Sequence, residues 1–271
     1  FFSRAWKEME FHCVKLEEVC RQKDAEFLGI LNDIKYGRNL QNVIAYLESN
    51  QSSDLMEEAP YLVGTNAKAD KINQAHMRAL DEKTEKKFWA IIEDIKNISF
   101  AKQSLVVNVG AKVMLTANDA NGEYVNGTMG TIIDISKERG DATCIQVLTD
   151  KGKKVDVYRY EREIERQDIE ESKEKDKNGE TVIVKKIVRK IVGSFKQFPI
   201  KIAWAMSIHK SQGQTFVQVN IDPRCWDSRQ FYVAVSRAES VAGIHFMAPI
   251  MKQYIRTLSD EVIKILRESL Y

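Results

Sequence analysis

The stretch SIHKSQGQTF, residues 207–216, places a polar segment between two predicted strands. Residues 200–206 before it are mostly apolar, and residues 216–221 at its end alternate apolar with polar side chains. Polar residues at the carboxyl end of a strand lie where open α/β sheets bind ligands, and Gly213 lets backbone N–H groups approach a phosphate. The segment therefore indicates an α/β sheet whose edge recognises phosphate and sugar. A polar turn that caps neighbouring backbone is the alternative, and it suits His209 alone better than the whole cluster.

Helix and strand patterns typical of an α/β domain occur on both sides of this segment. Helical spacing of apolar residues, N-cap residues such as Thr65 and Asn66, and Gly37 after a helix give the boundaries. Before residue 105 we expect a strand at 11–17, helices at 24–35 and 40–49, a strand at 60–64 and a helix at 67–80. After residue 216 we expect a helix capped by Asp227 or Ser228 and ending near Arg237, a strand at 243–248 and a helix at 259–270.

Residues 106–158 show short alternating strands and tight turns instead. One strand is expected over 107–115, and the Asn-Gly pairs at 121/122 and 126/127 tolerate the positive φ that such turns need. Further strands are expected at 131–135, 144–148 and 154–158. We interpret this part as a small all-β barrel.

A protruding β-hairpin is predicted after the barrel. Residues 161–177 are densely charged, Asn178-Gly179 is a turn pair, and TVIVKKIVRKIV at 181–192 is a β-branched strand. The second strand of the hairpin carries the basic side chains Lys185, Lys186, Arg189 and Lys190. The first strand carries acidic side chains that include Glu170, Glu171 and Glu174. The basic side chains could contact nucleic acid, but they could equally form cross-strand ion pairs with the acidic ones. The hairpin therefore does not establish DNA binding.

The β-rich middle is an insertion, because the α/β segments on both sides of it must belong to one sheet. The predicted fold class is α/β, a parallel-sheet domain with an inserted small all-β barrel and a hairpin. The predicted boundaries are 1–105 for the first part of the α/β domain, 106–197 for the insertion and 198–271 for the second part.

Composition argues against a zinc site, a secreted protein and a membrane protein, whereas the net charge is uninformative. A net charge of +2 neither demands nor excludes a nucleic-acid partner, so any basic surface must be local. The four cysteines form no C-x-x-C pair and have no His at zinc spacing, which predicts buried thiols and no metal site. No signal peptide or membrane segment appears, and together with the cysteines this predicts an intracellular protein. Phe1 starts in mid-pattern without an initiator Met, so we expect a piece of a longer chain.

Residues 207–216 together with YVAVSR at 232–237 resemble motifs V and VI of superfamily 1B DNA helicases of the PIF and RecD type. Residues 17–37 look like the motif IV region of that family, with an Arg-Gln pair, and residues 62–73 look like its Thr-Asn helix start. Residues 109–130 are similar to the entry into the Src-homology-3-like barrel that the family inserts into its second RecA-like domain. The resemblance implies the C-terminal half of a bacterial PIF-like protein, which would act in the bacterial cytosol or nucleoid.

Arg21 and Arg237 are the candidate catalytic residues. Phosphoryl transfer needs cations where charge gathers on the γ-phosphate, and an arginine from a second domain can raise the rate by ~10³ to 10⁵. Helix-dipole compensation or a surface ion pair is the structural alternative for Arg237. Arg21 precedes a helix, where the dipole would favour an acid instead.

The remaining candidates divide between nucleotide and DNA. Thr65 and Asn66 open a helix, whose N–H groups can hold a DNA phosphate, and an ordinary N-cap is compatible with that role. By resemblance, the nucleotide-binding residues are Gln22, Gly213, Gln214 and Thr215. By the same resemblance, the DNA-binding residues are Thr65, Asn66, Ser207, His209 and Lys210.

The resemblance implies the second motor domain of an ATP-dependent 5′-to-3′ DNA helicase. No G-x-x-x-x-G-K-[ST] string occurs in the sequence, and the family's Walker B acid is also missing, so we expect no ATP hydrolysis by this chain alone. ATP and Mg²⁺ would be held mainly by a missing N-terminal RecA-like domain. Single-stranded and forked duplex DNA are the expected partners of a monomer. A non-catalytic single-strand binding or scaffolding module is the main alternative. A protein-interaction domain centred on the barrel and hairpin is the third possibility.

Overall fold

The computed structural model describes residues 3, 4, 8, 19–93, 104–137, 143–175, 181–257, 262 and 264. These residues form two compact units, Phe1–Ala75 with Ala203–Tyr271 and His76–Ile202. The strand predicted at 11–17 and the turn at 178/179 lie outside the described residues, and so does the helix at 259–270 except for residues 262 and 264. None of the described helices has the length and apolar character that crossing a membrane requires.

A parallel four-stranded sheet organises the first unit. Its order is β12 (Ala205–Ser207), β1 (Tyr61–Val63), β13 (Val219–Ile221) and β14 (Ile244–Phe246), and neighbouring strands are parallel throughout. All three residues of β12, β1 and β13 are buried, as expected for strands covered on both faces. The predicted α/β class is therefore confirmed. Ser207 ends β12, and the polar residues His209, Lys210 and Ser211 come shortly after it.

The α-helices between residues 25 and 78 begin and end within two residues of where the sequence indicates. In α2 (Ala25–Tyr36) the Asp24 carboxylate accepts hydrogen bonds from the N–H groups of Glu26 and Phe27, and Gly37 closes the helix at a φ of 68°. The helices α3 (Leu40–Asn50) and α4 (Asn66–Arg78) follow, separated by β1. Thr65 caps α4, because its Oγ1 accepts a 3.3 Å hydrogen bond from the Lys68 N–H.

The helix predicted to end near Arg237 is shorter than expected. The helix α5 covers only Gln230–Val235, and its N-cap residue is Arg229 at a φ of 62°, so the predicted capping by Asp227 or Ser228 is wrong. One Asp227 carboxylate oxygen accepts a hydrogen bond from the Ser228 N–H, and the other lies 3.5 Å from His209 Nε2. The Asp227 carboxylate therefore contacts these groups and does not cap α5. Arg237 follows the C-cap residue Ser236 and lies outside the helix.

The second unit is antiparallel. Its five-stranded sheet has the order β11 (Ile200–Ile202), β5 (Lys112–Leu115), β6 (Met129–Lys137), β7 (Thr143–Thr149) and β8 (Lys154–Val157). Within the described ranges this sheet is not closed, since β11 and β8 are its edges, so the expected barrel is seen as an open sheet. The single strand expected over 107–115 is wrong, because Gly110 at a φ of 86° separates β4 (Ser104–Val107) from β5.

The apolar run 200–206 is also two strands rather than one. Ile200–Ile202 pairs with β5 in the antiparallel sheet, whereas Ala205–Ser207 pairs with β1 in the parallel sheet. The chain therefore passes from the second unit into the first between these two strands. The second unit starts at His76 rather than 106, because β2 (Lys86–Trp89) pairs with β4 and β3 (Ile91–Glu93) pairs with β10.

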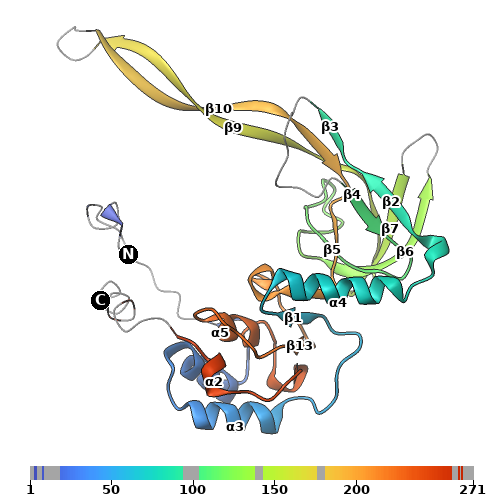
Figure 1. Ribbon diagram of the computed structural model, residues 1–271, viewed down its shortest axis with the longest axis vertical. Coiled ribbons are helices and arrows are strands. Elements are labelled where there is room, and N and C mark those ends of the chain that lie inside the picture. The colour runs from blue at the N-terminus through green and yellow to red at the C-terminus, as the bar shows by residue number, and fades with distance from the viewer. Residues whose placement is uncertain are drawn as a thin grey trace. The chain divides into compact units, whose positions relative to one another are not determined.

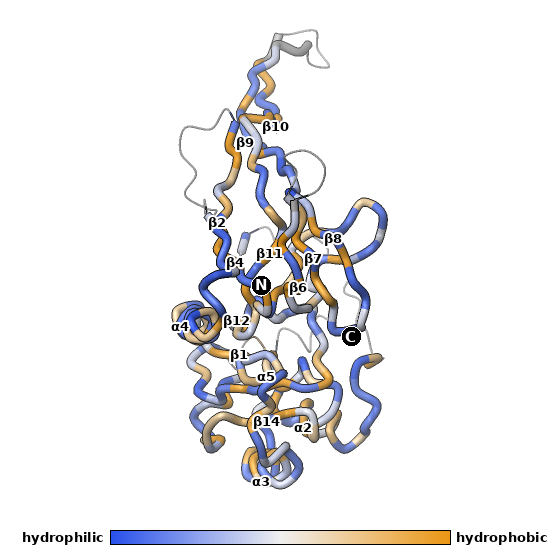
Figure 2. The backbone as a smooth tube through the Cα atoms, turned by 90° about the vertical axis from the view of Figure 1, so that its right-hand side faces the viewer, coloured by the Kyte–Doolittle hydropathy of each residue, from blue (hydrophilic) through white to orange (hydrophobic). Residues whose placement is uncertain are grey.

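Strands β9 (Tyr160–Lys175) and β10 (Thr181–Gln197) form the predicted hairpin, a long two-stranded ribbon (Figure 1). Hydrophilic and hydrophobic positions alternate along it (Figure 2). Lys185 lies 2.9 Å from the Glu171 carboxylate, and Lys190 lies 2.9 Å from that of Glu170. These basic side chains are therefore engaged in cross-strand ion pairs, as the sequence allowed. All four groups are at least half exposed, so water screens these pairs and they contribute little to stability.

Candidate functional site

Arg21 joins three segments that are far apart in the sequence. Its Nε donates a 2.9 Å hydrogen bond to Thr215 Oγ1, and its Nη1 donates one of 2.9 Å to the Ser236 carbonyl. Thr215 belongs to the polar segment after β12, and Ser236 follows α5. The structure thus brings together parts of the regions that resemble motifs IV, V and VI.

Gln22 fixes the same junction from a buried position. Only 3% of the residue is exposed, and its Nε2 donates hydrogen bonds to the carbonyls of Ser236 at 3.1 Å and Ala238 at 2.8 Å. These contacts satisfy backbone acceptors just beyond the α5 end, where helices leave carbonyls without partners. Gln22 therefore has a structural task here, and its contact with nucleotide stays a prediction.

Arg237 is half-buried beside Arg21. Its Nε donates a 3.0 Å hydrogen bond to the Val233 carbonyl, and its Nη2 donates one of 3.0 Å to Ser236 Oγ. Burial lowers the pKa of the Arg237 guanidinium, and the positive charge of Arg21 lowers it further. The bond to Val233 is the helix-end contact expected of a purely structural arginine, and it leaves the planar group close to a second cation.

Neither guanidinium forms an ion pair with a carboxylate in the described part of the chain. Two neighbouring cations without a counter-anion repel each other, and partial burial makes that repulsion stronger than in water. An anion such as a phosphate would relieve the repulsion and could accept hydrogen bonds from both groups. The pair is therefore suited to anion binding.

The loop that carries Thr215 is held in place by backbone hydrogen bonds. The Gln214 N–H donates to the Ser211 carbonyl at 2.9 Å, and the Phe216 N–H donates to the Arg237 carbonyl at 2.9 Å. Gly213 between them has a φ of 87°, and nothing lies within 4 Å of where its Cβ would be. Gly213 is thus required for its backbone conformation rather than for space.

We expect Gly213→Ala to lower the free energy of unfolding by about 1–2 kcal/mol, the cost of left-handed backbone for a residue with a Cβ. Gly29→Ala is the matched control. Gly29 lies in α2, with nothing within 4 Å of its Cβ position, so that alanine should stabilise by about 0.5–1 kcal/mol. Urea unfolding of both variants measures the two effects, and equal effects would show that the φ of Gly213 is not what matters.

The predicted DNA-binding residues lie at the carboxyl edge of the parallel sheet. Val63 and Ser207 are paired at the ends of β1 and β12, and Ser207 Oγ donates a 2.9 Å hydrogen bond to Asn66 Oδ1. Thr65 and Asn66 are exposed at the start of α4, whereas Ser207 is only 5% exposed. Ser207 therefore positions Asn66, which is better placed to meet a ligand.

His209 and Lys210 are exposed on the short 3-10 helix η2 (Ile208–Ser211). A cavity of about 360 Å³ lies between η2 and α5. It is lined by Ile208, His209, Gln212, Ser228, Arg229, Gln230, Tyr232 and Val233. Of the predicted DNA-binding residues, only His209 lines it.

A charged cluster at this edge was missed from the sequence. The buried Asp222 carboxylate accepts hydrogen bonds from Lys68 Nζ and from Arg224 Nε, the latter at 2.7 Å. Burial alone would raise the pKa of Asp222, but the hydrogen bonds from Arg224 and Lys68 outweigh it and lower the pKa. Asp222 directly follows β13, so the rule that polar residues after a strand mark a site could have found it.

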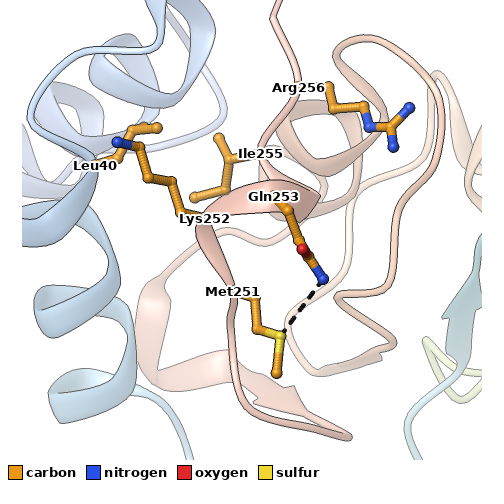
Figure 3. Close-up of a pocket in the computed structure, with 6 residues that line it drawn as sticks. All are labelled: Leu40, Met251, Lys252, Gln253, Ile255 and Arg256. Atoms are coloured by element: carbon orange, nitrogen blue, oxygen red, sulfur yellow. Dashed lines mark hydrogen bonds between the residues drawn. The ribbon is translucent and has the colours of Figure 1, made fainter.

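A second cavity, of about 630 Å³, is lined by residues outside this site. It lies near the 3-10 helix η4 (Lys252–Tyr254), and its lining residues are Leu40, Met251, Lys252, Gln253, Ile255 and Arg256 (Figure 3). The Gln253 amide donates a 3.7 Å hydrogen bond to Met251 Sδ there. Because none of the predicted site residues lines it, the geometry does not connect this cavity with the arginine pair.

No family model matches the sequence. The chain is similar to the ATP-dependent DNA helicase Pif1 of Bdellovibrio bacteriovorus, with 30% identity over 256 residues that cover 91% of this chain and 52% of that protein. It is 28% identical to PIF1 of Danio rerio, over 91% of this chain and 37% of that protein. The chain thus spans about half the length, or less, of these relatives.

Solved structures give the same likeness. Bacteroides sp Pif1 in complex with ADP-AlF4 has a TM-score of 0.76 at 28% identity and covers 98% of this chain, which covers 58% of that protein. Bacteroides Pif1 bound to ssDNA has a TM-score of 0.68 at 28% identity, again over 98% of this chain and 58% of that protein. Pif1 from Candida albicans reaches 0.70 at 25% identity, covering 98% of this chain and 63% of that one.

Proposed function

We propose that this chain, which is homologous to the DNA helicases of the Pif1 type, is the second motor domain of an ATP-dependent 5′-to-3′ DNA helicase. The family resemblance stated from the sequence is confirmed by these similarities. The observation that carries the finer proposal is that Arg21 and Arg237 lie side by side and no carboxylate among the described residues pairs with either. Such a pair suits a polyphosphate better than it suits protein packing.

Nucleotide would contact this chain through the two arginines. ATP with Mg²⁺ would be held mainly by a domain that carries the Walker A and B segments, since no G-x-x-x-x-G-K-[ST] string occurs in this sequence. Arg21 and Arg237 would then approach the γ-phosphate from the side opposite that domain and stabilise the negative charge that builds up during phosphoryl transfer. Gln214 and Thr215 would lie next to them, and Gly213 allows their loop its conformation. We propose that the chain alone does not hydrolyse ATP.

Single-stranded DNA would lie along the carboxyl edge of the parallel sheet. The N–H groups at the start of α4 face a phosphate favourably, and Asn66, His209 and Lys210 add exposed donors. Phosphate contacts carry no sequence information, so binding should be independent of sequence and weakened by salt. Bacteroides Pif1 bound to ssDNA and a structure of forked DNA with two coordinating Pif1 helicases are consistent with these partners. Because two Pif1 helicases coordinate in the second of these structures, the proposal does not include the monomer expected from the sequence.

Salt-dependent binding of the Lys210→Ala variant tests the DNA-binding half of the proposal. If Lys210 contacts a phosphate, the variant should bind every single-stranded sequence more weakly and lower the slope of log K against log salt by about 1. Lys252→Ala, an exposed lysine on η4, is the control and should leave the slope unchanged. Fluorescence anisotropy with a labelled oligothymidylate at several salt concentrations measures both. An unchanged slope for Lys210→Ala would remove this residue from the DNA path.

A further inference from the structure

Trp226 presents a large aromatic surface at the carboxyl edge of the parallel sheet. The residue is 56% exposed, although tryptophans are usually well covered in folded domains. Its Nε1 donates a 3.3 Å hydrogen bond to the Gly64 carbonyl, and a Cβ added at Gly64 would lie 3.5 Å from its Cδ1. One edge of the indole therefore rests on the backbone just before Thr65, and much of the ring meets solvent.

The backbone of Trp226 is fixed from both sides. Its N–H donates a 3.1 Å hydrogen bond to Gln230 Oε1, and its carbonyl accepts one of 2.7 Å from Arg256 Nη1. Gln230 is itself buried and donates from Nε2 to the same Gly64 carbonyl at 3.0 Å. The indole is thus held in one place, so a ligand that contacts it loses little conformational freedom of the protein.

Two cationic residues lie close along the chain to Trp226 or to Gly64, which its indole contacts. Arg224 precedes Trp226 by two residues, and Lys68 lies in the first turn of α4, which begins two residues after Gly64. Both bind the single buried carboxylate of Asp222, so the three side chains carry a net charge of +1. The Lys68 and Arg224 side chains remain 36% and 52% exposed. A flat aromatic surface beside partly exposed cations matches one nucleotide, a base next to its phosphate.

We propose that Trp226 is a base-stacking platform for one nucleotide of a single strand, and that Lys68 and Arg224 contact the adjoining phosphates. This inference rests on the proposed single-strand binding and adds a contact to the base rather than to the backbone. Stacking on an aromatic ring is tolerant of sequence, because every base has a π-face, so the platform is compatible with tracking along any strand. The structural alternative is that the indole serves only to cover Gly64.

Binding of a labelled oligothymidylate to the complete protein distinguishes these two roles. Stacking predicts that Trp226→Ala and Trp226→Leu weaken binding about 5- to 150-fold, while Trp226→Phe stays within about threefold of the wild type. Leucine covers Gly64 but offers no π-face, so it separates stacking from packing. Gly64 keeps its hydrogen bond from Gln230 in every variant, and thermal unfolding checks that each one folds. Trp89→Ala, equally exposed in the other unit, should bind as the wild type does.

An oligonucleotide with abasic sites supplies the second arm. Stacking predicts that the wild type and Trp226→Leu bind the abasic strand equally, because there is no base to lose. Wild-type affinity for Trp226→Leu on the normal strand would overturn the inference. If Lys210→Ala still weakened binding in that case, the proposed DNA path would stand without the platform. If neither variant weakened binding, the path itself would be wrong as well.

Discussion

Arg237→Ala should lower the DNA-stimulated ATPase rate of the complete protein about 10³-fold or more, while single-strand binding stays near the wild-type level. Transfer of the γ-phosphoryl group concentrates negative charge that an arginine from the opposite domain stabilises, and loss of such an arginine typically costs 10³ to 10⁵ in rate. Arg237 is suited to this role because its planar group is half-buried next to Arg21 with no carboxylate partner in the described residues. Steady-state ATPase assays with saturating single-stranded DNA measure the effect.

Two further variants separate catalysis from stability. Arg237→Ala also removes hydrogen bonds to the Val233 carbonyl and Ser236 Oγ, which should cost about 1–2 kcal/mol of unfolding free energy. Arg237→Lys keeps the charge but loses the planar fork, so most of the rate should remain lost. Arg38→Ala, whose guanidinium lies over the Tyr36 ring in the same unit, is the control and should turn over normally. Turnover of Arg237→Ala near the wild-type rate would remove Arg237 from the nucleotide site.

Local signals predicted the elements that local interactions stabilise. The Asp24 cap, the apolar spacing of Phe27, Ile30 and Ile34, and Gly37 define α2 almost to the residue. The apolar run 200–206 predicts one strand where the structure has two, because hydrophobicity indicates burial and not which strand is the hydrogen-bonding partner. Ile200 and Ala205 are both buried, yet they pair with strands in different sheets, and that pairing depends on residues far away in the sequence.

In the candidate site, too, local contacts could be predicted from the sequence and long-range contacts could not. Thr65 as an N-cap could be predicted from its neighbours, whereas the Arg21 to Thr215 contact joins residues 194 positions apart. Only the resemblance to helicase motifs placed those two residues in one site, since no spacing rule links them. Asp222 could have been found because it follows a predicted strand. Trp226 carried no signal, because its role depends on exposure, which a sequence does not record.

Arg21→Ala should lower the same ATPase rate about 10²- to 10³-fold, the usual cost of removing one donor that stabilises transition-state charge. Its guanidinium is oriented by Thr215 Oγ1 and the Ser236 carbonyl, both at 2.9 Å, which keeps it beside Arg237. Thr215→Val removes the first of these acceptors and keeps the side-chain shape and the second acceptor. The ATPase rate of Thr215→Val should therefore fall only about 3- to 10-fold, as expected for the loss of one hydrogen bond.

The double variant Arg21→Ala with Arg237→Ala tests whether the two groups act on one phosphate. Residues that stabilise the same transition-state charge give effects that do not multiply, so the double variant should be much more active than the product of the two single losses predicts. A loss equal to the product would place the arginines at independent sites. If Thr215→Val lost as much activity as Arg21→Ala, the function would belong to the hydroxyl or its loop, and Arg21 would serve only to position them.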